Sequence, residues 1–169
     1  MQRKQSLTRG VFVGALAGLL GCVVMAGFQE AVARNAETAD ELNQGPHAPD
    51  ASEENTTETA ARRAARQFGH TLSRQEKQAA GRWLHYGFGT LMGAAYGATA
   101  EVFPMVGAGL GTVFGSVLFL ATDEAALPLL DLASQPGDTK PAEHFLHWAS
   151  HVAYSMSMEV TRRVLVSRV

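Results

Sequence analysis

Long apolar runs alternate with strongly polar stretches along this chain. The first apolar run, GVFVGALAGLLGCVVMAGFQ, covers residues 10–29. As a helix it would be about 30 Å long, which matches the hydrocarbon core of a bilayer. Further apolar runs cover 83–103, about 105–122 and about 144–166. The pattern predicts an all-α integral membrane protein with four transmembrane helices.

Charge divides the chain in the same way. Residues 30–82 hold 9 of the 16 acidic and 7 of the 14 basic residues. The composition therefore predicts a polar, acidic linker from 30 to 72, within which a helix from Thr59 could lie on the membrane surface. SRQE at 73–76 is a capping box that starts the second long helix. We expect a basic N-terminus and first helix (1–29), the linker (30–72) and a three-helix membrane core (73–169).

Two rival interpretations concern the first apolar run. AVA at 31–33 fits a signal-peptide cleavage site, but the run is longer than a usual signal core, so an uncleaved helix is favoured. LLGC at 19–22 resembles a lipoprotein site, but the residues that follow stay apolar. Cys22 is the single cysteine, so no internal disulfide can form and the redox compartment stays open.

Basic residues near the span ends predict the orientation. Three precede the first run and three follow the core of the last: Arg3, Lys4 and Arg9, then Arg162, Arg163 and Arg168. The connection 123–143 has one Lys against five acids. By the positive-inside rule both termini are cytoplasmic, which requires an even number of spans.

Glycine recurs every fourth residue in three of the runs, and such stripes let helix backbones approach closely in lipid. The three series are Gly10, Gly14 and Gly18; Gly89, Gly93 and Gly97; and Gly107, Gly111 and Gly115. They predict helix packing, within one chain or between copies in a homo-oligomer. A glycine-lined conduit is the alternative.

The last run carries a polar stripe. At 100° per residue its members fall within about 80° of one another; they are His144, His147, His151, Ser155 and Arg162, bordered by Tyr154 and Met158. Charge at mid-bilayer is costly, so the stripe should face protein or water.

Depth sorts the polar residues into two layers. The outer layer holds His85, Asp123, Glu124, His144 and His147, with His151 deeper. It is read as inert interfacial hydrogen bonding, as a proton-responsive group or, more weakly, as a metal site at His147 and His151. The inner layer holds Glu101, Glu159, Arg162 and Arg163.

Glu159 is spaced to pair with Arg162 or Arg163. The alternatives for this inner layer are an anchoring ion pair, a proton- or ion-coupling carboxylate, and lipid-headgroup binding by the two arginines. Glu101, His151, Glu159, Arg162 and Arg163 are the proton- or ion-coupling candidates.

AEVFP (100–104) and SHVAYSMSMEVTRR (150–163) resemble the YagU-like family of bacterial inner-membrane proteins. The positions that carry the resemblance in the second stretch are His151, Tyr154, Ser157, Glu159, Arg162 and Arg163. The resemblance implies an inner-membrane location and relates Glu101 to His151, Glu159 and the arginine pair. It implies no substrate, cofactor or reaction. ATDE at 121–124 departs from the family, so no role passes to Asp123 or Glu124.

No nucleophile motif, phosphate loop or metalloprotease signature appears, so we expect no enzyme and no cofactor. The net charge of −2, without a basic cluster among exposed aromatics, argues against nucleic acid. The expected partner is the lipid bilayer, with no small-molecule ligand identified. We expect a multi-pass inner-membrane protein that is proton-responsive or conducts a small solute or ion. The alternative is a structural or stress-related scaffold that oligomerises through its glycine faces.

Overall fold

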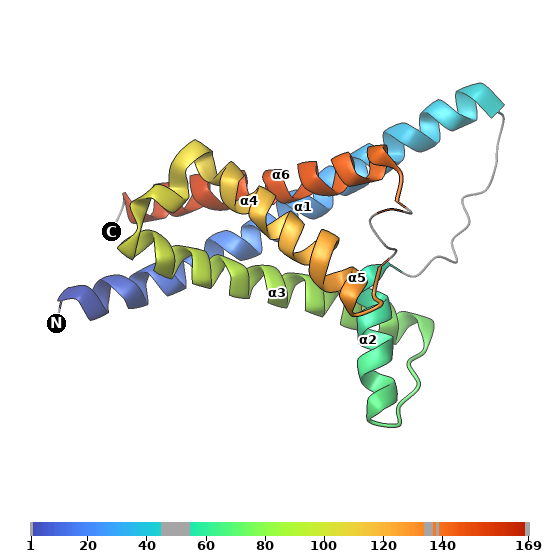
Figure 1. Cartoon of the computed structure of the whole chain (residues 1–169), viewed down its shortest axis with the longest axis horizontal. Helices are drawn as coiled ribbons and strands as arrows, with labels where there is room; N and C mark the ends of the chain where they lie inside the picture. The colour runs from blue at the N-terminus through green and yellow to red at the C-terminus, as the bar shows by residue number, and fades with distance from the viewer. Residues whose placement is uncertain (1, 45–54, 134–136, 138, 168–169) are drawn as a thin grey trace.

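A computed structural model describes residues 2–44, 55–133, 137 and 139–167, and every regular element in this part of the chain is helical (Figure 1). The prediction of an all-α fold is confirmed. The elements are α1 (Gln2–Gln44), α2 (Thr56–Gln67), α3 (Arg74–Val102), the 3₁₀ segment η1 (Pro104–Gly111), α4 (Thr112–Phe119), the π-helical segment η2 (Leu120–Ala126), α5 (Leu127–Leu129) and α6 (Pro141–Val166).

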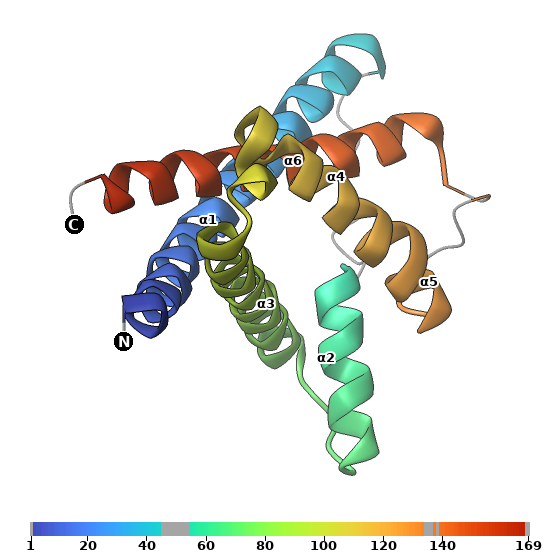
Figure 2. The same ribbon diagram turned by 60° about the vertical axis from the view of Figure 1, so that its left-hand side comes forward.

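The long helices α1, α3 and α6 form the body of the molecule, with α4 against α6 and α2 standing off to one side (Figures 1 and 2). α1 and α3 lie side by side and run in opposite directions, and α6 packs across α1. The beginning of α1 and the end of α6 lie at the same end of the molecule, together with η1 (Figure 1).

The first helix is longer than its apolar run. We predicted a linker from residue 30, but α1 continues to Gln44. The sequence EAVARNAETADELNQ is rich in good helix formers and contains neither Gly nor Pro. Arg34 also pairs with Glu30 one turn earlier, at 2.5 Å. Residues 30–44 therefore belong to a helix and not to the predicted polar linker.

The second long helix begins where the capping box predicts. Ser73 Oγ accepts a hydrogen bond from the Glu76 N–H, and the Glu76 carboxylate accepts one from the Ser73 N–H at 2.8 Å. These bonds hold the pKa of Glu76 below its ordinary value. Part of the 30–72 stretch is helical as well. α2 begins at Thr56, and Asn55 is its N-cap.

The third apolar run differs most from its prediction. We expected one helix from about Met105 to Thr122, ended by Asp123 and Glu124. Instead η1 reverses the chain, with Gly109, Leu110 and Gly111 all at positive φ, and the α-helix begins only at Thr112. The helical path then continues through η2 to Leu129, with both acids inside it. The Asp123 and Glu124 side chains pair with histidines of α6, and these pairs offset the free-energy cost of removing two carboxylates from water.

Two described segments are long and apolar enough to cross a membrane, Ser6–Asn35 and Pro104–Leu129. By length and composition they match the first and third predicted spans. α3 and α6 are as long, but they carry more polar side chains.

The first two glycine series pack against each other within the chain. Gly97 lies against the backbones of Gly10 and Gly14, and Gly93 lies against those of Gly14 and Gly18. A methyl group added at Gly93 would lie 2.6 Å from the Gly18 Cα, a distance that side-chain carbons do not tolerate. The α1 and α3 backbones are therefore in direct contact.

The third glycine series packs against α6 instead. A methyl group at Gly111 would lie 2.8 Å from the Ser155 carbonyl oxygen, and one at Gly115 would lie 2.6 Å from that of His151. Gly107 lies under the Glu159 carboxylate. All three series are thus used in contacts within the chain.

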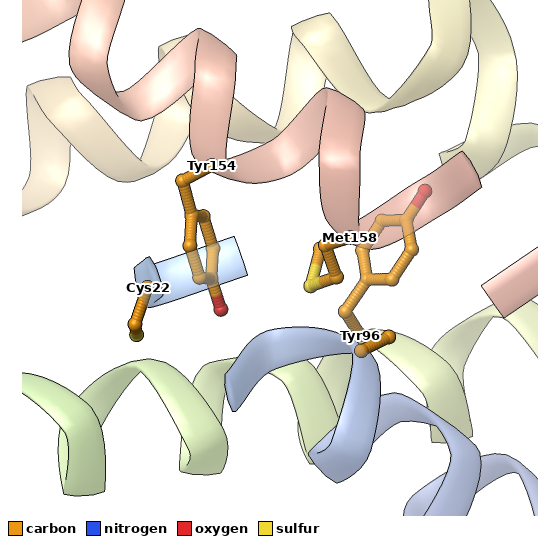
Figure 3. Close-up of a cluster of buried hydrophobic side chains, with 5 residues drawn as sticks. Cys22, Tyr96, Tyr154 and Met158 are labelled. Atoms are coloured by element: carbon orange, nitrogen blue, oxygen red, sulfur yellow. The ribbon is translucent and has the colours of Figure 1, made fainter. Parts of the chain in front are cut away.

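A small core lies between the three long helices (Figure 3). Its fully buried members are Ala17, Cys22, Tyr96, Tyr154 and Met158. The Tyr154 hydroxyl donates a 2.6 Å hydrogen bond to the Gly89 carbonyl, which ties α6 to α3 across α1. With no side chain at residue 89, this carbonyl is open to the phenol.

We predict that Gly93→Ala lowers the free energy of unfolding by about 1–3 kcal/mol, because the new methyl group forces two backbones apart. The matched control is Gly87→Ala on the same helix, where an added methyl group meets nothing within 4 Å. Gly87→Ala should leave stability unchanged or raise it by up to about 1 kcal/mol. Unfolding of the purified protein in mixed micelles, followed by circular dichroism, measures both. Equal stability of the two variants would refute the backbone contact.

Candidate functional site

Glu159 is the most deeply buried charged residue in the described part of the chain, with no exposed surface. Its carboxylate accepts hydrogen bonds from Arg162 Nε at 2.7 Å and from Arg162 Nη2 at 2.9 Å. Arg163 Nε donates a third at 2.7 Å. The sequence spacing predicted a pair with one arginine or the other, and the structure forms both.

This buried carboxylate also connects α6 to two other elements. The Tyr96 hydroxyl of α3 donates to Glu159 at 3.0 Å. Arg163 Nη2 donates to the Gly107 carbonyl of η1 at 2.8 Å. We call these residues, Tyr96, Gly107, Glu159, Arg162 and Arg163, the inner cluster. Because both arginines are engaged with Glu159, lipid-headgroup binding by them gains no support.

Glu101 belongs to a neighbouring group rather than to the inner cluster itself. Its carboxylate accepts a hydrogen bond from the Ser6 hydroxyl and lies 3.3 Å from Arg9 Nη2, both on α1. Arg162 is near enough to interact with it electrostatically. Glu101 therefore lies near Arg162 of the inner cluster, but its direct partners come from the first helix.

At the opposite end of the stripe, one carboxylate is shared by two imidazoles. Asp123 Oδ1 lies 3.4 Å from His147 Nδ1, and Asp123 Oδ2 lies 3.4 Å from His151 Nε2. The Thr122 hydroxyl donates to Asp123 at 2.7 Å. We call Thr122, Asp123, His147 and His151 the outer cluster. The π-helical turn of η2 presents Asp123 to α6, and such turns recur at functional sites.

Burial changes across the outer cluster. The side chain of His147 is 51% exposed, whereas that of His151 is 10% exposed. The Nδ1 atom of His151 lies 3.0 Å from the His147 carbonyl oxygen, which holds the ring in place. Beside the cluster, His144 pairs with Glu124 at 2.5 Å. Solvent therefore reaches the Asp123 carboxylate from the His147 side.

His85, which we also placed in the outer layer, lies apart from these pairs. Its carbonyl oxygen accepts a weak bond from the Cys22 thiol at 3.7 Å, and its ring packs edge-on against Tyr86. Its Nε2 atom is buried without a hydrogen-bond partner among the described residues. It lies within electrostatic range of His151.

A metal ion finds no ready set of ligands. Within the described ranges, no group of three or more His, Cys, Asp or Glu side chains is arranged to hold one. His147 and His151 are spaced one turn apart, and each has a ring nitrogen 3.4 Å from an oxygen of the same Asp123 carboxylate. The metal alternative therefore gains no support.

The middle of the stripe is packed against protein. Ser155 and the bordering Met158 are fully buried between the two clusters, and Gly115 lies directly on Ser155. The Ser155 hydroxyl donates to the Val152 carbonyl of its own helix. The predicted inward orientation of the stripe is thus observed for its central residues.

Sequence reasoning missed four partners of the acidic groups, Ser6, Arg9, Tyr96 and Thr122. One signal could have found the first two. If Gly10 and Gly14 of one helix face Gly97 and Gly93 of an antiparallel partner, the next turn out places residue 6 opposite residue 101. No comparable signal marks Tyr96, whose role follows from the position of α6.

A family model described as a protein of unknown function (DUF1440) matches residues 49–160. The chain therefore belongs to the DUF1440 family. No curated protein and no solved structure matches it. The match includes Glu101, Asp123, His151 and Glu159, and it supplies no activity for any of them.

We predict that Glu159→Gln lowers the free energy of unfolding by about 3 kcal/mol, near the lower end for a broken buried ion pair because Arg163 is half-exposed. Glu76→Gln is the control, since Glu76 is an exposed helix cap whose amide replacement can still accept the Ser73 N–H. Denaturant unfolding of both variants at pH 7 provides the comparison. If the two variants lose the same stability, the inner cluster does not hold the helices together.

Proposed function

We propose that this DUF1440 protein is a four-span protein of the bacterial inner membrane whose outer cluster responds to protons. The single observation that supports the proton response best is the position of Asp123 within 3.4 Å of two imidazoles, one half-exposed and one nearly buried. The bacterial inner membrane, and membership of the YagU-like family within this fold, rest on the sequence resemblance.

Membrane insertion through four helices is supported by where the large apolar side chains lie. Beyond the two apolar spans, α3 exposes Leu84, Phe88 and Leu91, and α6 exposes Met156, Val160 and Val164. α6 buries its polar Ser150, His151, Ser155 and Glu159, and α3 buries its glycines and Tyr96. In water so many exposed apolar side chains would favour aggregation, whereas in a bilayer they face lipid.

The orientation follows from the same arrangement. The beginning of α1 and the end of α6 lie at the same end of the molecule (Figure 1). Arg162 and Arg163 of the inner cluster lie near the end of α6. The positive-inside rule then places this end in the cytoplasm and the outer cluster at the opposite membrane surface.

The outer cluster suits a proton response for a chemical reason. An imidazole ordinarily titrates near pH 6.5, so its charge changes within the physiological range. Protonation of His147 turns the contact between its neutral ring and the Asp123 carboxylate into an ion pair between α6 and η2. Glu143 also faces His147, Glu124 is paired with His144, and His85 is near His151. Acidification should therefore strengthen the contact between η2 and α6.

A conduit along the stripe has less support. Solute movement would require an open path from the outer cluster to Glu159, and the intervening Ser155 and Met158 are fully buried. A structural role is favoured by one observation, the hydrogen-bonded inner cluster, which joins α3, η1 and α6. Oligomers through the glycine faces, the other part of the scaffold alternative, gain no support, because these faces pack within the chain.

We predict that the wild-type protein is more stable at pH 5.5 than at pH 8, by about 0.5–1 kcal/mol for these partly exposed pairs. The stabilisation is present where the imidazoles are protonated and is lost as pH rises through their titration range. Asp123→Asn should remove most of this difference. Asp131→Asn is the control, because Asp131 has a positive φ that Asn tolerates and lies outside the cluster.

Unfolding free energies of the three proteins across this pH range, in one detergent, test the proposal. An Asp123→Asn protein that keeps the wild-type pH dependence would contradict the proton response. The scaffold would then be the better account.

A further inference from the structure

We infer that a groove between α1 and α3 binds an anionic glycerophospholipid, with the lipid phosphate at Arg82 and an acyl chain running toward Leu19. The inference rests on the proposed membrane location. The groove has a volume of 420 Å³, within the range of about 300–1,000 Å³ found for ligand sites. It is lined by Leu19, Ala79, Arg82, Trp83 and Tyr86.

One face of a single helix builds most of this groove. Ala79, Arg82, Trp83 and Tyr86 follow the i, i+3, i+4, i+7 spacing, so their side chains share one side of α3. This is the side of α3 that also carries Gly89, Gly93 and Gly97, so the groove continues the α1–α3 contact beyond its glycines. Leu19 closes the groove from α1 and is 41% exposed. The lining is therefore mainly apolar, with one cation.

The groove spans a boundary in the polarity of α3. On its N-terminal side the helix begins with RQEKQ, which is hydrophilic. On its C-terminal side Leu84, Phe88 and Leu91 are exposed. Gly18 of α1 lies against Gly89, so the adjacent Leu19 marks the deep end and Arg82 the shallow end. A ligand that fits must place a polar head beside Arg82 and an apolar tail beside Leu19.

The side chains at the shallow end fit a phospholipid head. Arginine binds phosphate through paired N–H donors, and Trp and Tyr favour the boundary between headgroups and hydrocarbon. Trp83 is 79% exposed, as expected for a ring that contacts lipid. Two acids lie near this end, Glu76, whose carboxylate accepts the Ser73 N–H, and Glu58 of α2, whose side chain lies against Gly81. Neither of them lines the groove, where Arg82 carries the single charge, so charge complementarity favours an anionic head over a zwitterionic one.

Trp83 provides a local probe, because it is one of only two tryptophans. With Trp148→Phe as the background, the fluorescence of the full-length protein reports on the groove alone. The protein is reconstituted into phosphatidylcholine vesicles that contain a minor share of lipid with brominated chains, which quench nearby indoles. The brominated lipid is either phosphatidylglycerol or phosphatidylcholine, with the same chains.

We expect brominated phosphatidylglycerol to quench Trp83 with about fivefold higher apparent affinity, the factor that one guanidinium contributes at an anionic lipid. Arg82→Gln should reduce this preference to none. Arg66→Gln, which removes an exposed arginine of α2 outside the groove, should retain it.

Each other result overturns the inference in a distinguishable way. Equal quenching by the two lipids in the protein with Arg82 would refute the site and leave the membrane location standing. A preference that survives Arg82→Gln would show that another cation attracts the lipid. Absence of quenching by either lipid would contradict the membrane location itself.

Discussion

Direct contact between the backbones of α1 and α3 is the constraint on which the other contacts depend. Gly10, Gly14 and Gly18 face Gly97, Gly93 and Gly89, so the two helices lie in one antiparallel register. One turn beyond the series at one end, Ser6 and Arg9 meet Glu101. One turn beyond it at the other end, Cys22 meets His85. A side chain at any of these glycines would force the two helices apart and would break the pairs at both ends of the contact.

The polar stripe of α6 has different physical roles at its two ends. Glu159 is buried and fully hydrogen-bonded, and removing one partner of such a cluster leaves a buried charge unpaired. It therefore holds α6 against α3 and η1. Asp123 lies beside the half-exposed His147, and the proton response that we propose rests on this contact. The fully buried Ser155 and Met158 lie between the inner and the outer cluster.

Patterns with a fixed period predicted most of the fold. The glycine spacing, the capping box at Ser73 and the i+3 and i+4 positions of Arg162 and Arg163 all had the predicted consequences. Predictions from composition alone failed, as in the helical stretch 30–44, because polar residues can be good helix formers. The paired Asp123 inside a helix could not be foreseen, since its partners come from a helix about twenty residues later.

Impermeant cysteine labelling in intact cells tests how the helices are inserted and which way they run. Cys22→Ala gives a cysteine-free background, because Cys22 is the single cysteine. Single cysteines at Arg66 and Thr139 should then react with an impermeant maleimide from outside. A cysteine at Ser167 should react only after the membrane is permeabilised. Labelling of Ser167→Cys in intact cells, or protection of Thr139→Cys, would contradict a four-span protein with both termini in the cytoplasm.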